Sequence, residues 1–334
     1  MLLALALAPQ RTTLYGNLAR FLVVPEVLAS PLAPRLRDHE RRQLAGQDWL
    51  LLDLADATDD DLALLWRLGT VAGVYEYFPA LDEHPGPFLR PLDPPAAPFL
   101  PQEIIEARRY RGKTSELFTT VLLNLGLFAG DFAADTGERL RVLDPLSGGG
   151  TTLFTALVRG YDAVGIEREK DDFDTTDAYV QQFLLGVGIP YRRTEERVRG
   201  VGRRAVFTIG RPEQTRTLAL VLGNTYDAVE LLEGLPGGAR FHAIVADLPY
   251  GIQHKGQVMR FLEEAVPGWA EVLLPGGTMT LAWEATAPRR EAVTAAIESQ
   301  PSLHVVTAPP YYDLEHPVDR QIKRRDVLVI RKEE

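Results

Sequence analysis

The sequence contains no cysteine in its 334 residues. Disulfide bonds, thiolate metal sites and catalysis by a cysteine thiol are therefore excluded. Histidine is scarce, and its six residues do not have the spacing of metal ligands, so we expect no metal centre. No apolar run reaches the roughly 18 residues that a membrane-spanning helix needs, so we expect no membrane partner either.

Positive charge is in the minority, because 36 Lys and Arg face 46 Asp and Glu and the net charge is −10. A nucleic-acid partner would have to be attracted by a local patch rather than by the field of the whole protein. The apolar start, MLLALALAPQ, has no basic segment before it, and we interpret it as a buried strand rather than a targeting signal. These features predict a cytoplasmic globular protein and leave its oligomeric state open.

Proline is concentrated between residues 83 and 101, which read EHPGPFLRPLDPPAAPFLP. Proline fixes its own backbone and removes a donor, so such a run is typical of an extended connector. We therefore predict a small α+β domain over residues 1–90, a linker over 91–102 and a larger domain over 103–334. In the small domain, strand patterns at 48–56 and 70–78 flank a helix pattern at 59–69, whose first turn is acidic.

The larger domain has a regular alternation of strand and helix patterns. The predicted strands, which cover residues 139–146, 162–169, 218–224, 241–249, 278–285, 303–309 and 326–332, are nearly continuous apolar runs. Such runs are expected where helices cover both faces of a sheet. The sequence thus predicts an α/β fold with a doubly wound, Rossmann-like sheet.

A glycine-rich loop follows the first of these strands, in VLDPLSGGGTTLFTAL. Ligands of open α/β sheets bind at the carboxyl ends of the strands, and glycine lets the backbone approach them closely. The spacing is not G-x-G-x-x-G, and Asp144 at the strand end would repel a pyrophosphate, which argues against a dinucleotide. Glu167 lies 23 residues after Asp144, where an acid can hold a ribose diol. A cationic nucleoside such as S-adenosylmethionine (SAM) suits this loop better than other nucleotides.

The string D-P-L-S-G-G-G-T-T resembles the D-P-x-x-G-x-G-T-T signature of class I SAM-dependent methyltransferases that modify amino groups. The order of elements over residues 103–331 is similar to that family, whereas the first 100 residues are not covered. The resemblance implies a Rossmann-like methyltransferase domain after the small α+β domain, with SAM as cofactor. We expect cofactor contacts from residues of the loop and of the next strand: Asp144, Pro145, Ser147, Gly148, Gly150 and Glu167.

A second motif, Asp247-Leu248-Pro249-Tyr250, follows the fourth predicted strand and resembles the D/N/S-P-P-Y/F/W tetrapeptide of the same family. An exocyclic base amine is a poor nucleophile, because its lone pair is delocalised into the ring. A carboxylate and a backbone carbonyl can accept its two hydrogens and stabilise the developing charge. The resemblance implies that these four residues are catalytic, that Tyr250 stacks on a flipped or unpaired base, and that Asp247 also lies against SAM.

The choice of substrate follows from two further features. Methylation at carbon-5 of pyrimidines resembles families that need a cysteine nucleophile, and this chain has none. The string D-x-P-Y-G, which ends on Gly251, resembles RNA guanine-N2 methyltransferases, especially the tRNA enzymes and related RNA methylases. We therefore expect RNA, with tRNA first, as the nucleic-acid partner, positioned with the help of the N-terminal domain. DNA adenine-N6 or cytosine-N4 methylation is the alternative.

Three other segments suggest binding residues. YRGKTSEL, at 110–117, resembles the segment that closes over the methionine end of SAM, which implies roles for Lys113 and Thr114; a helix cap is the other interpretation. Asn224, after its strand, is expected to hold the adenine amino group or to cap a helix. The arginine-rich stretch 190–216 has eight Arg against three Glu, which suggests phosphate contacts or a solvated hairpin. The expected substrate-binding residues are Arg203, Arg204, Gly251, His254 and Lys255.

Two further hypotheses remain open at this point. A silent nucleic-acid-binding scaffold could keep the fold without catalysis, but Asp144, Glu167, Asp247 and Tyr250 argue against silence. Methylation of a small molecule or a protein would share the glycine loop but does not usually come with D-x-P-Y.

Overall fold

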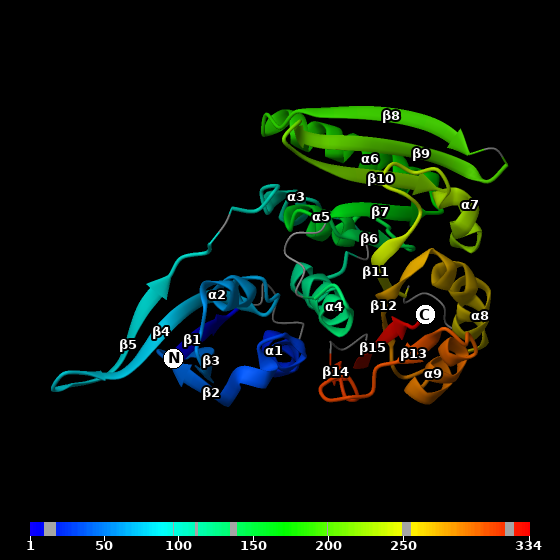
Figure 1. Cartoon of the computed structure of the whole chain (residues 1–334). Coiled ribbons are helices and arrows are strands. Elements are labelled where there is room, and N and C mark those ends of the chain that lie inside the picture. The colour runs from blue at the N-terminus through cyan, green and yellow to red at the C-terminus, as the bar shows by residue number, and fades with distance from the viewer. Residues whose placement is uncertain are drawn as a thin grey trace.

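The computed structural model describes residues 1–9, 18–95, 97–110, 113–133, 139–198, 200–248, 255–317 and 324–334 (Figure 1). Two sheets organise these residues, one of five strands near the N-terminus and one of ten strands in the remainder. The α/β fold with a smaller α+β part in front of it is thus as predicted. Among the described helices, none is long and apolar enough to cross a membrane.

The five-stranded sheet is antiparallel and has the order β2-β3-β1-β4-β5. Its strands are β1 (Leu2–Leu7), β2 (Leu36–Leu44), β3 (Gln47–Leu54), β4 (Val71–Leu81) and β5 (His84–Leu92). The helices of this part are α1 (Leu18–Ala29), α2 (Asp59–Trp66) and the short η1 (Ala33–Arg35). Alternate residues of the strands, such as Leu3, Leu50 and Leu52, share a buried core with Val23 and Val27 of α1. The predicted acidic first turn of α2 is present, and Thr58 and Asp61 form its capping box.

The proline-rich stretch contains a strand that the sequence did not lead us to expect. β5 runs from His84 to Leu92 and pairs only with β4 within the described sheet. Proline is tolerated there because an edge strand has one side without ladder hydrogen bonds. The extended connector expected from residue 83 is therefore part of the sheet up to Leu92, two residues into the predicted linker.

The large sheet has the order β13-β15-β12-β11-β6-β7-β10-β9-β8, with β14 paired to β15 (Figure 1). Five neighbouring strands are parallel: β6 (Arg141–Asp144), β7 (Asp162–Glu167), β10 (Gln214–Leu222), β11 (Phe241–Asp247) and β12 (Leu273–Glu284). Counted along the chain, their spatial order is 3-2-1-4-5, which is that of a doubly wound Rossmann-like sheet. The remaining strands are β8 (Tyr191–Val198), β9 (Gly202–Arg211), β13 (Leu303–Val305), β14 (His316–Pro317) and β15 (Arg324–Lys332).

Helices cover both faces of this sheet, which explains its apolar strands. Val142 and Leu143 are neighbours in β6, yet they lie in two different cores on opposite faces. The helices are α3 (Glu103–Glu106), α4 (Glu116–Ala129), α5 (Thr151–Val158), α6 (Lys170–Gly186), η2 (Thr225–Asp227), α7 (Ala228–Leu232), α8 (Lys255–Val272) and α9 (Arg290–Glu298). Residues of α4, α5 and α6 share one core, and residues of α7, α8 and α9 share the other.

A buried polar network connects the two parts of the molecule. Glu26 of α1 is fully buried and accepts hydrogen bonds from the amides of Gly69 and Thr70 and from Asn124 Nδ2 of α4, at 2.8, 3.0 and 2.6 Å. On its other side, the oxygen of the Asn124 amide accepts a bond from Arg159 Nη1 at 2.5 Å. Since buried polar groups must find partners, this network ties α1 to the helices of the large sheet.

Candidate functional site

Three neighbouring parallel strands each end on an acidic residue. Asp144 is the last residue of β6, Glu167 of β7 and Asp247 of β11, and β6 lies between the other two strands. The carboxyl ends of parallel strands lie at one edge of the sheet, so the structure brings these three predicted site residues together. Among the described residues, no group of His, Asp and Glu could hold a metal ion.

Asp144 is the most buried of the three acids, with 5% of its surface exposed. Its pKa is raised to about 7, chiefly by burial and also by the charges of Asp247 and Glu167, while hydrogen bonds from Thr152 and from the Leu146 amide oppose the rise. The amide of Leu146 donates to Asp144 Oδ1 at 2.9 Å. A nearby positive charge would stabilise the charged form of this carboxyl group, because it would offset both the cost of burial and the repulsion by the other two acids.

The glycine loop lies directly after β6 and has the conformation that its residues require. Gly148 and Gly150 have φ angles of +47° and +88°, a region that residues with a Cβ rarely adopt. Ser147 anchors the loop to β7, because its amide donates to the Ile166 carbonyl at 2.9 Å. A Cβ on Gly149 would come within 2.4 Å of the Tyr110 ring, so this ring lies directly on the loop. Tyr110 Oη and Thr151 Oγ1 are 2.5 Å apart.

Glu167 lies beside this loop, with its carboxylate held by the turn that follows β7. The amide of Glu169 donates to Glu167 Oε1 at 2.6 Å. Burial raises the pKa of Glu167, and hydrogen bonds from the backbone, including that of Gly148, counteract this rise. Glu167 thus links the turn after β7 to the glycine loop after β6.

Asp247 is held by two residues from distant parts of the chain. Thr114 Oγ1 donates to Asp247 Oδ2 at 2.6 Å, and Arg325 Nη2 lies 3.2 Å from the same oxygen. Thr114 comes from the segment that the sequence associates with SAM, and Arg325 comes from the start of β15. The carboxylate at the end of β11 is therefore fixed between the N-terminal edge of α4 and the last strand.

The other residues of the second motif are described only in part. Leu248 is buried, and its amide donates to the Ala282 carbonyl at 2.8 Å, so the chain still follows β12 at this point. Pro249, Tyr250, Gly251 and His254 lie outside the described residues, as does the side chain of Lys255. Their predicted roles stay predictions.

Lys113 and Asn224 have internal partners. The Lys113 ammonium donates to the Ile105 carbonyl and to Glu116 Oε1, both at 2.6 Å, and to the Arg108 carbonyl at 2.9 Å. It therefore fixes the segment that carries Tyr110. Asn224 Oδ1 accepts from the Tyr226 amide at 3.2 Å and caps η2, which is the second of the two interpretations that the sequence left open.

The arginine-rich stretch forms the hairpin of β8 and β9 and the start of β10. Arg203 pairs with Asp174 of α6 and with Glu195, and its guanidinium carbon lies 4.6 Å from the centre of the Phe173 ring. Arg204 is 5% exposed and donates to the Leu231 and Glu233 carbonyls, both at 2.7 Å. These contacts give both arginines a part in packing the hairpin against α6 and α7.

Two residues near the strand ends were not singled out from the sequence. Tyr110 lies on the glycine loop, and Arg325 contacts Asp247. Tyr110 stands in the segment 110–117 that was singled out as a whole. Arg325 is the last residue of the stretch PPYYDLEHPVDRQIKRR at 309–325, whose aromatic and basic residues suggest contacts with an unpaired base, and it directly precedes the apolar run DVLVIRK.

A cationic nucleoside such as SAM fits the residues at these strand ends. Burial disfavours the charged form of the Asp144 carboxyl group, and a positively charged ligand beside it would favour that form again. The glycine loop leaves room for backbone approach, since a Cβ on Gly148 would meet nothing within 4 Å. Asp144, Gly148, Gly150 and Glu167 are thus the residues that would hold it.

The chain matches no family model and no curated protein. Among solved structures, TrmN from Thermus thermophilus shares 13% identity and a TM-score of 0.49, over 99% of this chain and 100% of that one. A methyltransferase from Pyrococcus furiosus shares 15% identity and a TM-score of 0.38, over 68% of this chain and 88% of that one. An rRNA methylase from Streptococcus thermophilus shares 13% identity and a TM-score of 0.37, over 67% and 100%. The strand order of the large sheet defines the fold independently of these distant similarities.

Proposed function

We propose that this protein is a SAM-dependent methyltransferase that acts on an exocyclic amine of a base in RNA, namely guanine N2 of tRNA. One observation carries the proposal: three acids end three adjacent parallel strands beside a glycine loop, and one of them opens the D-x-P-Y motif. In this arrangement a cation would pair with the Asp144 carboxylate, and an amine would donate a hydrogen bond to the Asp247 carboxylate.

Each residue has a separate task in this proposal. When bound, SAM supplies an electrophilic methyl group. Asp144 and Glu167 hold the cationic nucleoside, while the glycine loop lets the backbone approach it. Asp247 and the Leu248 carbonyl accept the two hydrogens of the base amine, which directs the nitrogen lone pair outward and stabilises the developing charge. Tyr250 stacks on the base, so that the base must be unpaired or flipped out.

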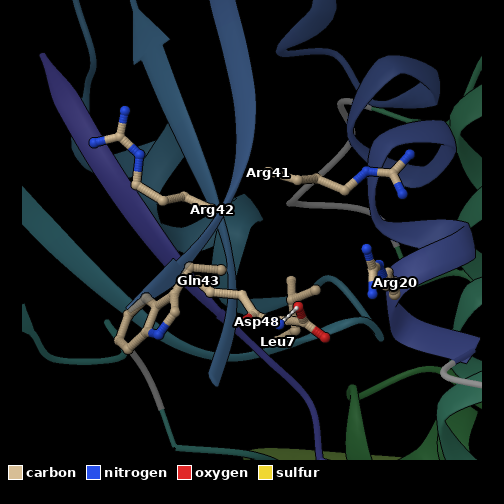
Figure 2. A pocket seen from close by; sticks show the side chains of 7 residues that line it. Leu7, Arg20, Arg41, Arg42, Gln43 and Asp48 are labelled. Atoms are coloured by element: carbon tan, nitrogen blue, oxygen red, sulfur yellow. Dashed lines mark hydrogen bonds between the residues drawn. The ribbon is translucent and has the colours of Figure 1, made fainter. Parts of the chain in front are cut away.

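The N-terminal part offers a place for RNA phosphates. Figure 2 shows a hollow on this part, where Arg41 extends from β2 toward α1, which carries Arg20, and Arg42 extends to the other side of the strand. Guanidinium groups suit phosphate oxygens, and such contacts position a nucleic acid without reading its sequence. We therefore propose that this part positions RNA. Arg42 also donates to Glu40 and Tyr77, and Arg203 and Arg204, which the sequence suggested for substrate contacts, likewise bind acceptors within the protein.

The test is transfer of labelled methyl from SAM to two pools, unmodified bulk tRNA and unmethylated genomic DNA, followed by digestion to nucleosides. We expect the label in N2-methylguanosine from the tRNA pool. Label in N6-methyladenine or N4-methylcytosine from DNA would make the DNA alternative correct. No label in either pool, together with no thermal shift on adding SAM, would favour a silent scaffold and contradict the proposal.

A further inference from the structure

Arg325 reaches the strand ends because of how β15 pairs with its neighbour. In β12, Ala282 pairs with Asp247 of β11 on one side, and Glu284, two residues further on, pairs with Arg325 of β15 on the other. β15 is antiparallel to β12, so its first residues lie where the parallel strands end. The sheet therefore places the start of β15 beside the D-x-P-Y motif.

The guanidinium of Arg325 is fixed on two sides. Its Nη2 lies 3.2 Å from Asp247 Oδ2, and its central carbon lies 4.4 Å from the centre of the Phe118 ring. Phe118 is fully buried at the start of α4, and Arg325 itself is 7% exposed. A planar group between a carboxylate and a buried ring has little freedom to rotate, so it fixes the carboxylate as well.

An ion pair can serve structure alone, and the same strand contains such a pair for comparison. Arg331 lies six residues further along β15 and pairs with Asp131 at 2.6 Å, with side chains 39% and 57% exposed. That pair is largely open to solvent and needs little desolvation. The Arg325–Asp247 pair is 8% and 18% exposed. Burying two charges costs several kcal/mol that their attraction seldom repays, so a buried pair is poorly explained by stability alone.

We propose that Arg325 is a positioning residue, which holds the Asp247 carboxylate in the orientation that accepts a hydrogen of the base amine. Arg325 also supplies the countercharge of Asp247 within the protein. Asp144 and Glu167 are then the acids that contact the cationic nucleoside, and Asp247 is the acid that contacts the base amine. This inference rests on the proposed function, because the amine it serves is that of the proposed substrate.

The structure predicts how charge and orientation are coupled in this pair. In Arg325→Met, Asp247 keeps its charge and its bond from Thr114 but loses the cationic group that helps to orient it. In Asp247→Asn, the amide can still accept a hydrogen, but Arg325 becomes a buried cation without its carboxylate. In the double variant, both charges are gone and the amide acceptor remains. We therefore expect the double variant to be more active than the product of the two single losses.

The experiment is a double-mutant cycle on turnover, in the full-length chain with SAM and the RNA methylated by the wild type. We expect each single variant to lose about tenfold or more in kcat, and the double variant to lose no more than the worse single one. The Kd for SAM and the KM for RNA should change by less than about threefold, because Arg325 acts through Asp247. Arg325→Lys should keep more activity than Arg325→Met, since it retains the charge.

Arg331→Met is the matched control, since it removes an arginine of the same strand from an exposed pair, and its kcat should equal that of the wild type. The inference is overturned if Arg325→Met keeps the wild-type kcat. It is also overturned if the kcat loss of the double variant equals the product of the two single losses, while only the changes in melting temperature are non-additive. If the wild type methylates no RNA or DNA, the proposed function itself fails and the inference fails with it. If the wild type is active, the double-mutant cycle tests only the positioning role of Arg325.

Discussion

Replacing Asp247 with alanine is expected to lower kcat by about 10²- to 10³-fold, the range found when one group that stabilises transition-state charge is removed. Alanine can accept neither hydrogen of the amine, and it also removes the group that Thr114 and Arg325 hold. The Kd for SAM should change by less than about threefold, since Asp144 and Glu167 remain. Single-turnover methyl transfer and calorimetric titration of SAM measure the two quantities separately.

Stability must be followed in the same variant, because alanine leaves Arg325 as a buried cation. A lowered melting temperature is therefore expected, and kcat should be measured well below it. Asp131→Ala is the control, since it removes an aspartate from the exposed pair with Arg331 and should leave kcat unchanged. Near-normal turnover of folded Asp247→Ala would show that Asp247 is not catalytic.

Replacing Asn124 with leucine is expected to lower the free energy of unfolding by about 3–5 kcal/mol. The amide of Asn124 donates to Glu26 Oε1 at 2.6 Å and accepts from Arg159 Nη1 at 2.5 Å. Leucine would leave the fully buried Glu26 carboxylate and the half-buried Arg159 guanidinium without this link. Burial already lowers the pKa of Arg159 to about 9, so its charge is sensitive to the loss of an acceptor.

Urea denaturation measures this change, provided that the slope of the transition stays that of the wild type. Gln43→Leu is the control, because Gln43 is exposed and its one described bond, to Asp48, is 3.3 Å long. It should alter stability by less than about 0.5 kcal/mol. A change below about 1 kcal/mol in Asn124→Leu would mean that the network does not hold the two parts together.

The ends of the parallel strands could be predicted from the sequence because local patterns determine them. Three of the apolar runs reach an acid at their end, and the carboxyl ends of parallel strands lie at one edge of a sheet. That reasoning places Asp144, Glu167 and Asp247 together without knowledge of the strand order. The glycine loop is also local, and Gly148 and Gly150 have the positive φ angles for which glycine is suited.

Contacts between distant segments could not be predicted in this way. Arg325 lies 78 residues from Asp247 along the chain, and only the antiparallel pairing of β15 with β12 brings them together. The local charge count over residues 190–216 made the arginines look unbalanced. It omitted Asp174 and Asp177, which lie before the stretch on α6 and pair with Arg203 and Arg193. β5 was missed because proline disfavours strands in general but not at a sheet edge.

The most direct test of the account is calorimetric titration of the protein with SAM at several pH values between 6 and 8.5. The pKa of Asp144 is about 7, so the carboxyl is mostly neutral at pH 6 and mostly charged at pH 8. A cation prefers the charged form, so the Kd for SAM should fall about tenfold from pH 6 to pH 8 and level off above it. Binding near pH 7 should release about half a proton, seen by comparing buffers of different ionisation enthalpy. In Asp144→Asn, SAM binding should be weaker and independent of pH over this range. No binding at any pH, or equal binding by the wild type and Asp144→Asn, would contradict the assignment of these strand ends to SAM.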